Sequence, residues 1–161
     1  MVEESQLKYW RDAGHVARRT LEAMKLELQP GKTFHEIIES AERFIHRHGG
    51  KPAFPATIAV NDMAAHFTTN HLIDGVDGWD NDNVLSNGDL VKIDFGVHIK
   101  GHIGDNALTM EIGNSNNHTE QIKAAKEARD AAVEMLHPGT PWYKVGQAAA
   151  QPSLDAGFQP I

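Results

Sequence analysis

The stretch that decides the fold is Asp94-Phe95-Gly96-Val97-His98-Ile99-Lys100-Gly101-His102-Ile103-Gly104-Asp105. Its two flanks, residues 90–97 and 102–112, are rich in β-branched and apolar residues that recur at every second position, as in half-buried strands. The Lys100-Gly101 pair between them indicates a tight turn. The stretch therefore predicts an antiparallel β-hairpin, and the rest of the chain can be read outward from it.

The hairpin carries two aspartates whose relative position depends on the turn. A two-residue turn beginning at Ile99 would place Asp94 directly opposite Asp105, whereas one beginning at Lys100 would place Asp105 opposite Gly96. Both registers put the two carboxylates on the same face, because side chains alternate along a strand. Two such charges repel unless a raised pKa, a basic partner or bound cations offset the repulsion. A site for two divalent ions that activates water is one such arrangement.

The two faces of the first strand differ in polarity. One face is apolar and consists of Val91, Ile93, Phe95, Val97 and Ile99. The face with Asp94 also carries Lys92, Gly96 and His98, so it is polar and partly open. A binding site and a plain solvated surface would both look like this, and the pattern alone leaves both open.

Composition excludes several classes of protein. The chain has 161 residues, enough for one domain with a core, and a net charge of −7 that disfavours a nucleic-acid-binding surface. It has no cysteine, which excludes disulfides and thiolate metal sites. No segment is typical of a signal peptide or a membrane span, so we expect a soluble, cytoplasmic protein. Most of the ten histidines fall on polar helix positions or helix ends, where we expect them to be solvated: His15, His35, His46, His48, His118 and His137.

Two helices are expected before the strands in the sequence, and two after them. A first helix buries one stripe, made of Leu7, Trp10, Gly14, Ala17, Leu21, Met24 and Leu28. Thr33-Phe34-His35-Glu36 reads as a capping box that opens a second helix, which Gly49-Gly50 ends. Two more helices are expected, from about His118 to Leu136 and after Pro141, the latter kinked or shortened by Pro152.

Strands are expected between the two pairs of helices. They begin at about Phe54, and an acidic loop at Asp74–Asn83 interrupts them. Asn87-Gly88 indicates a turn before the hairpin.

The chain also contains an internal repeat. Leu28-Gln29-Pro30-Gly31 matches Leu136-His137-Pro138-Gly139 at an offset of 108 residues, and Gly49 matches Gly157 at the same offset. A repeated helix–turn–helix unit predicts a duplicated fold. We expect residues 1–161 to form a single incomplete domain, with residues 1–112 as a first pseudo-repeat and residues 113–161 as the start of a second. The chain is then the front part of a longer protein.

Two segments resemble methionine aminopeptidases. Val91-Lys92-Ile93-Asp94-Phe95-Gly96-Val97-His98 with Gly101-His102-Ile103-Gly104-Asp105 is similar to their double-aspartate segment. Ala53-Phe54-Pro55 through Asn61 to Ala64-Ala65-His66-Phe67-Thr68 resembles their substrate-site segment, in the form of the type II branch of archaea and eukaryotes. The resemblance covers nearly the whole chain. It implies an α+β fold, the pita-bread fold, in which a curved antiparallel sheet is covered by helices and two related halves enclose a dinuclear metal site.

The resemblance also implies roles for three residues. Asp94 would chelate one metal and Asp105 would bridge both, while His66 would be the catalytic and substrate-binding histidine. The cofactors would be two divalent ions, cobalt, manganese, iron or zinc, and this ligand set does not choose among them. The family's remaining ligands, a histidine and two glutamates, belong to the second half and are absent from this chain. We therefore expect the chain alone to be inactive. His98 and His102 flank the aspartates and are taken as structural.

The implied function is the removal of N-terminal methionine from nascent proteins by a full-length enzyme. We expect the N-terminal peptide of a nascent protein as substrate, association with the ribosome as a further possibility, neither DNA nor a membrane as partner, and a cytoplasmic monomer. Two alternatives stay open. One is a non-catalytic paralogue that acts as a binding protein, which the retained aspartates and the acidic charge disfavour. The other is a metallopeptidase of the prolidase or creatinase branch, which usually carries an extra N-terminal domain.

Overall fold

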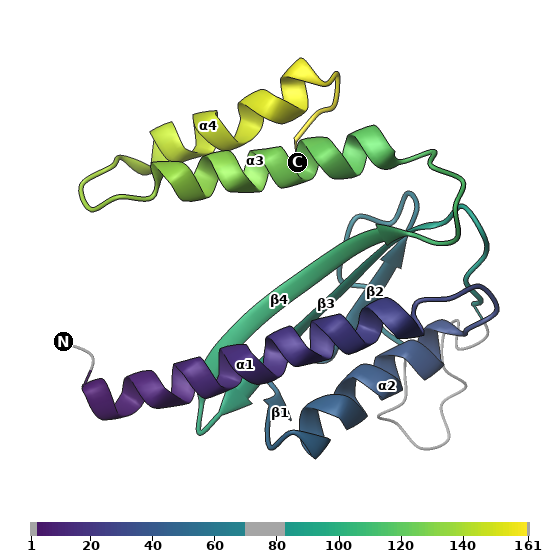
Figure 1. The fold of residues 1–161 in the computed structure, drawn as a ribbon, viewed down its shortest axis with the longest axis vertical. Coiled ribbons are helices and arrows are strands. Elements are labelled where there is room, and N and C mark those ends of the chain that lie inside the picture. The colour runs from purple at the N-terminus through teal and green to yellow at the C-terminus, as the bar shows by residue number, and fades with distance from the viewer. Residues whose placement is uncertain (1–2, 70–82, 161) are drawn as a thin grey trace. The chain divides into compact units, whose positions relative to one another are not determined.

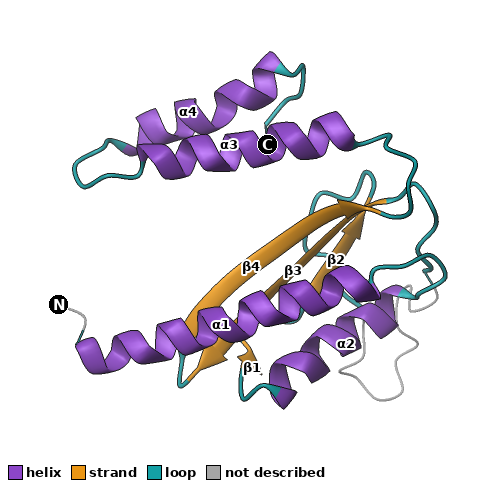
Figure 2. Cartoon of the chain, viewed as in Figure 1, coloured by secondary structure: helices purple, strands orange, loops and turns teal. Residues whose placement is uncertain are grey.

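The computed structural model describes residues 3–69 and 83–160. Their elements are α1 (Glu4–Glu27), α2 (Phe34–Arg47), β1 (Lys51–Pro52), β2 (Thr57–Val60), β3 (Leu90–Ile99), β4 (His102–Glu111), α3 (Thr119–Met135) and α4 (Trp142–Asp155) (Figures 1 and 2). The chain divides into two compact units at residue 115, the first with the sheet and two helices and the second with two helices alone. The expected α+β class, with helices covering an antiparallel sheet, is confirmed.

The hairpin of β3 and β4 is the centre of the first unit. All pairings in the sheet are antiparallel: β4 lies along one edge of β3, and β1 and β2 lie along the other. Lys100 and Gly101 form the turn, and both have positive φ angles, 51° and 82°, as a type I′ turn requires. Asp105 therefore pairs with Gly96, so the second of the two expected registers is correct.

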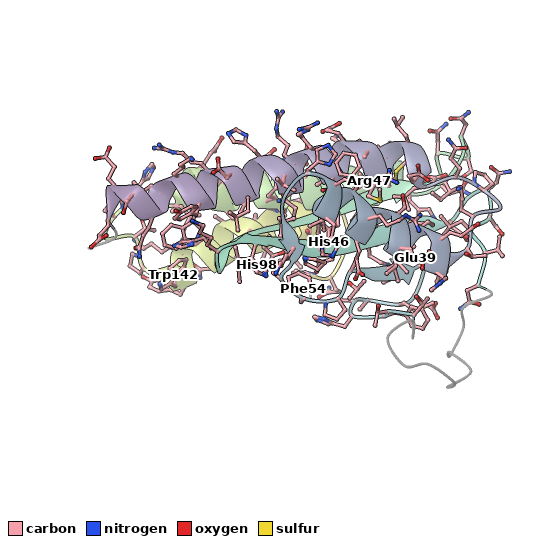
Figure 3. All side chains as sticks on the ribbon, turned by 90° about the horizontal axis from the view of Figure 1, so that it is seen from below. Glu39, His46, Arg47, Phe54, His98 and Trp142 are labelled. Atoms are coloured by element: carbon pink, nitrogen blue, oxygen red, sulfur yellow. The ribbon has the colours of Figure 1, made fainter. Side chains whose placement is uncertain are left out.

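The core lies on one face of this sheet. Val91, Ile93, Phe95 and Val97 of β3 are fully buried there, under α1 and α2 (Figure 1). From α2 the buried side chains are Phe34, Ile37, Ile38, Ala41 and Ile45. Polar side chains of α2, among them Glu39, His46 and Arg47, can be located in Figure 3. The face of β3 that carries Asp94 is left on the other side of the sheet, uncovered by these two helices.

The expected buried stripe of α1 is partly wrong. The buried residues are Ala13, Val16, Ala17, Thr20 and Met24. Leu7 and Trp10 are 37% and 40% exposed, because the first turns of the helix extend beyond the hydrophobic core. Trp10 instead meets the His102 ring edge to face, with 4.6 Å between ring centroids. Thr20 can be buried because its hydroxyl donates to the Val16 carbonyl at 2.9 Å.

Local signals in the first unit are mostly confirmed. Thr33 and Glu36 form the capping box: the Glu36 amide donates to Thr33 Oγ1 at 3.1 Å, and the Thr33 amide donates to Glu36 Oε2 at 2.9 Å. The expected strand start at Phe54 is wrong, since Phe54 and Pro55 lie between β1 and β2. Pro55 has no amide hydrogen for a ladder, which accounts for the break. The expected acidic loop falls almost entirely on residues 70–82, outside the described residues.

The second unit is a pair of packed helices, α3 and α4, joined by the turn after Leu136. Pro152, which was expected to kink or shorten the last helix, does not end it, because α4 continues to Asp155. A proline inside a helix lacks one amide hydrogen and so removes one backbone hydrogen bond. The Pro152 carbonyl still accepts from the Ala156 amide at 3.2 Å, so the last turn forms. No helix among residues 3–69 and 83–160 combines the length and apolar character needed to cross a membrane.

The second helix pair repeats the boundaries of the first. The end of α3 and both ends of α4 lie 108 residues after the end of α1 and both ends of α2. The glycines agree as well: φ is 86° at Gly31 and 90° at Gly139, and it is 82° at both Gly49 and Gly157. Gly49 and Gly157 directly follow the C-cap residues of α2 and α4, a position where left-handed glycine is common because it lacks a Cβ atom. The offset found in the sequence thus also relates helix ends and backbone angles.

Candidate active site

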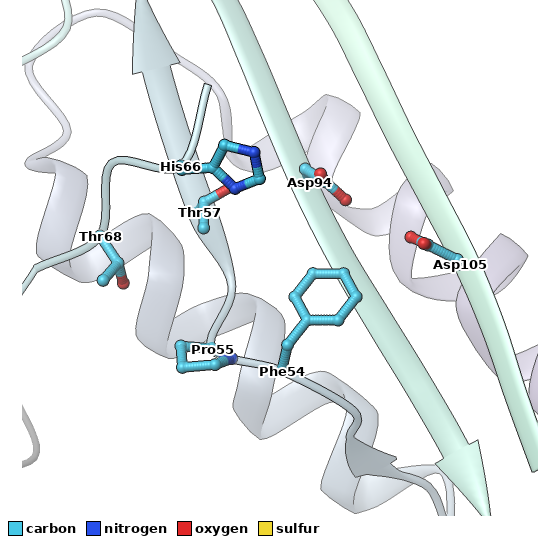
Figure 4. A pocket seen from close by; sticks show the side chains of 7 residues that line it. All are labelled: Phe54, Pro55, Thr57, His66, Thr68, Asp94 and Asp105. Carbon is cyan, nitrogen blue, oxygen red and sulfur yellow. The ribbon is translucent and has the colours of Figure 1, made fainter.

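A pocket of about 470 Å³ opens on the uncovered face of the sheet. Its walls come from three places in the chain: the β1–β2 connection, the segment after β2, and the β3–β4 hairpin (Figure 4). The lining residues are Phe54, Pro55, Thr57, His66, Thr68, Asp94 and Asp105. All three residues singled out from the sequence as candidate site residues are among them.

Asp94 and Asp105 point toward one another across the hairpin (Figure 4). Because Asp105 pairs with Gly96, it is one diagonal step from Asp94 on the same face, a relation that separates Cα atoms by about 7–8 Å. Asp94 is half-buried and Asp105 is exposed. Burial first, and then the negative charge of Asp105, raise the pKa of Asp94, while His66 acts in the opposite direction. Keeping both carboxylates charged at this separation therefore costs free energy, and a bound cation would lower this cost.

His66 is carried by an irregular segment that follows β2 rather than by a strand. Its φ angle is 64°, a left-handed conformation that few residues other than glycine adopt. Directly after His66 the chain is hydrogen-bonded to β2 and to the residue before it: the Ile58 amide donates to the Phe67 carbonyl at 2.8 Å, and the Thr68 hydroxyl donates to the Ala56 carbonyl at 2.8 Å. These bonds place His66 on the wall of the pocket beside Asp94.

The donor set suits a divalent cation but is small. Carboxylate oxygens and imidazole nitrogen are common ligands of first-row divalent metals. Within residues 3–69 and 83–160, however, no group of three or more histidine, cysteine, aspartate or glutamate side chains is placed to hold a metal ion. The two aspartates fit a metal site that needs further ligands.

A second, smaller pocket of about 220 Å³ adjoins the first and shares Thr57 and Asp94 with it. Lys92 and Thr109 also line it, together with Ala59, Ala64, Ala65, Ile93 and Ala107. Burial lowers the pKa of Lys92, and the Asp62 carboxylate opposes this effect. Thr57 and Lys92 were not singled out as site residues from the sequence. Thr57 pairs with Asp94, a relation that only the register between β2 and β3 reveals.

The two histidines of the hairpin make structural contacts. His98 lies on the Asp94 face, but its Nδ1 accepts a hydrogen bond from the Gly101 amide at 3.3 Å, next to the turn. His102 lies on the opposite face, where its ring contacts Tyr9 and Trp10. Neither histidine lines the larger pocket.

Residues 8–160 match the model of metallopeptidase family M24. The chain belongs to this family. Over 150 residues it is 36% identical to a methionine aminopeptidase of Archaeoglobus fulgidus, an alignment that covers 93% of the chain and 48% of that relative. The resemblance to methionine aminopeptidases is thus confirmed. The chain spans about half the length of the curated relatives it matches.

Solved structures support the same fold. A methionine aminopeptidase from Thermotoga maritima matches with a TM-score of 0.86 at 22% identity, covering 99% of this chain and 64% of the other. The prolidase from Pyrococcus horikoshii matches with a TM-score of 0.79 at 26% identity, covering 96% and 43%. The expected pita-bread architecture is confirmed, and the chain forms part of it. Membership in a metallopeptidase family implies divalent metal ions.

Proposed function

We propose that the full-length protein containing this chain is a methionyl aminopeptidase that uses divalent metal ions to remove N-terminal methionine from nascent proteins. One observation carries the proposal: Asp94, Asp105 and His66 line a single pocket, in a chain that is 36% identical to a methionine aminopeptidase over 150 residues. Aspartate pairs on one sheet face are suited to holding metal ions that act on water.

Five of the seven residues that line the pocket have a proposed role. Asp94 would chelate one divalent metal ion and Asp105 would be shared between two. The ions would be cobalt, manganese, iron or zinc, and ligands outside this chain would complete the site. Bound metal ions of this kind lower the pKa of water and polarise a substrate carbonyl. His66 binds the substrate and donates a hydrogen bond to the oxygen on which negative charge develops. The Phe54 ring and Pro55 offer an apolar wall for the methionine side chain.

The remaining expectations stand as proposals of the same kind. Residues 1–112 are a first pseudo-repeat and residues 113–161 begin a second, which the coincidence of helix ends and left-handed glycines supports. The whole protein is a cytoplasmic monomer that acts on N-terminal peptides. The ribosome is a candidate partner, and neither DNA nor a membrane is a partner. Residues 1–161 alone are inactive, because two carboxylates cannot complete the metal site.

A second candidate is activity on peptides with proline in the second position. The similarity to the Pyrococcus horikoshii prolidase favours it, since that structure matches 96% of the chain. Substrates separate the two candidates. A methionyl aminopeptidase cleaves Met-Ala-Ser and leaves an Xaa-Pro dipeptide intact, and a prolidase does the reverse.

The full-length protein should release methionine from Met-Ala-Ser only when metal is present. Chelation should abolish the activity and added divalent metal should restore it. Asp94→Asn and Asp105→Asn should lower both metal content and turnover. Asp130→Asn, at an exposed position on α3, is the matched control and should behave like the parent. Activity that survives complete removal of metal would contradict the proposal.

A test of His66 needs a replacement residue that tolerates the left-handed backbone conformation at this position. Asparagine adopts left-handed conformations more readily than most residues, so His66→Asn removes the imidazole with little strain. We expect turnover to fall roughly a hundredfold, the scale for losing one oxyanion donor. Metal content should remain that of the parent. Loss of metal with retained turnover per bound metal would assign His66 to the metal site instead.

A further inference from the structure

Lys92 is a half-buried cation on the face of the sheet that carries the candidate site. It precedes Asp94 by two residues on β3, so the two side chains share a face. Its Cα partners are Ala59 on β2 and Thr109 on β4, and all three residues line the smaller pocket. An ammonium group that loses water in this way needs a hydrogen-bond acceptor in its place.

The acceptor is the backbone carbonyl of Asn61, 2.8 Å from Lys92 Nζ. Asn61 is in a left-handed conformation, with φ at 55°. Its amide donates to the Leu90 carbonyl at 2.9 Å, its Oδ1 accepts from the Leu90 amide at 2.9 Å, and its Nδ2 donates to Asp89 Oδ1 at 2.9 Å. Together with the hydrogen bond from Lys92 to the Asn61 carbonyl, every polar group of Asn61 is hydrogen-bonded.

Asn61 is the residue at which the chain leaves β2 for the segment that carries His66. The far end of this segment is fixed by the hydrogen bonds of Phe67 to Ile58 in β2 and of Thr68 to Ala56 just before that strand. Its near end is fixed at Asn61. A short segment that is anchored at both ends keeps its side chains in a narrow range of positions. Here the side chain between the two anchors is the His66 imidazole on the pocket wall.

We infer that Lys92 is a positioning residue for His66: its ammonium holds the Asn61 carbonyl and thereby fixes the start of the segment that carries the imidazole into the pocket. This inference rests on the proposed function in so far as His66 acts in turnover. The hydrogen bond itself is independent of that function, which allows the two ideas to be tested separately.

The first test is a double-mutant cycle in the full-length protein. Lys92→Met keeps the unbranched stem and removes the ammonium. We expect kcat on Met-Ala-Ser to fall roughly tenfold, the scale of one hydrogen bond to a charged group, with unchanged metal content. In the His66→Asn background the same change should lower kcat by less than about twofold, because the group that Lys92 positions is gone. An equal loss in both backgrounds would overturn the inference.

Two further variants sharpen the cycle. Lys92→Arg keeps a cationic donor and should recover most of the kcat lost in Lys92→Met. Lys51→Met removes an exposed lysine from β1, outside both pockets, and should leave kcat unchanged. If Lys92→Arg is as impaired as Lys92→Met while both fold, the inferred role of the hydrogen bond is wrong.

A second readout does not depend on activity. In protein labelled with ¹³C at histidine, the imidazole signal of His66 is assigned by its disappearance in His66→Asn. Lys92→Met should shift or broaden this signal and leave the signals of His15 and His46 on the helices in place. An unchanged His66 signal would overturn the inference even if the enzyme is active. A shifted signal in a protein without aminopeptidase activity would retain the inferred contact and reject the proposed function.

Discussion

Gly104 of β4 lies directly against the backbone of Gly14 in α1. A Cβ atom on Gly104 would lie 2.9 Å from the Gly14 nitrogen and 3.0 Å from its Cα, closer than side-chain carbons normally come. The next residue, Asp105, faces the pocket on the opposite side of the strand. The contact therefore fixes how closely β4 approaches α1. This strand carries Asp105, one of the two site aspartates.

Gly104→Ala should destabilise the protein by about 1–3 kcal/mol, because the added methyl group can be accommodated only if helix and strand move apart. Gly14→Ala is the matched control: a Cβ there meets no atom within 4 Å, and alanine is favoured over glycine inside a helix by about 1 kcal/mol. Denaturant unfolding of both variants gives the comparison. Equal stability of the two variants would mean that the contact at Gly104 is looser than described.

The capping box of α2 should show in the acid dependence of stability. Hydrogen bonds from the Thr33 amide, and then from its hydroxyl, lower the pKa of Glu36 below its ordinary 4.5. A lowered pKa in the folded state gives stability that is present above pH 4.5 and is lost as the pH falls through the folded pKa. Glu36→Gln keeps an acceptor but cannot titrate, so its unfolding free energy should vary less in this range.

Thr33→Ala should cost about 1 kcal/mol at neutral pH, the usual effect of removing an N-cap side chain. It should weaken the acid dependence due to Glu36 only in part, because it removes the Thr33 hydroxyl, the second cause of the lowered pKa, and keeps the backbone amide, which is the larger cause. Thermal and denaturant unfolding across pH 3–7 measure both effects.

The raised pKa of Asp94 should depend in part on Asp105. In metal-free protein, Asp94 should titrate above its ordinary 3.8, so its contribution to stability is present below that pH and is lost as the pH rises through the folded pKa. Asp105→Asn removes the second cause and should lower the pKa of Asp94, yet leave it raised, because burial is the larger cause. Carboxyl ¹³C NMR titration measures the shift. A pKa of Asp94 unaffected by Asp105→Asn would place the two carboxylates farther apart than the pocket indicates.

The isolated chain, residues 1–161, should bind divalent metal weakly and show no turnover on Met-Ala-Ser. Its described residues contain the aspartate pair but no cluster of three ligands, so bound cations would stay largely hydrated. Calorimetric titration with Mn²⁺ or Co²⁺, beside the full-length protein, provides the comparison. Affinity equal to that of the full-length protein would contradict the view that further ligands lie elsewhere.

Sequence patterns predicted the shared face of Asp94 and Asp105 but not their register. Period-two alternation is the same for both turns, and a lysine at the first turn position gives a weaker type I′ signal than asparagine would. Only the paired strands show that Lys100 and Gly101 both take left-handed angles. The capping box needed no such context, because its two partners are three residues apart in sequence.

The features that could not be predicted from the sequence depend on tertiary contacts. Helical periodicity located the buried side of α1 but could not show that the core ends before Trp10, since that depends on where the sheet lies. Lys92 looked like a surface residue on a polar strand face. Its hydrogen bond joins residues 31 positions apart, and no local pattern predicts such a contact.

The left-handed backbone at His66 bears on how relatives of this chain can be sorted. A histidine in this conformation carries a conformational penalty of about 1–2 kcal/mol that glycine escapes and asparagine largely escapes. Once catalysis is no longer selected, mutational drift at this position gains stability by leaving histidine. Retained histidine is therefore expected where the imidazole itself is needed, whereas glycine or asparagine there would mark a relative that no longer depends on it.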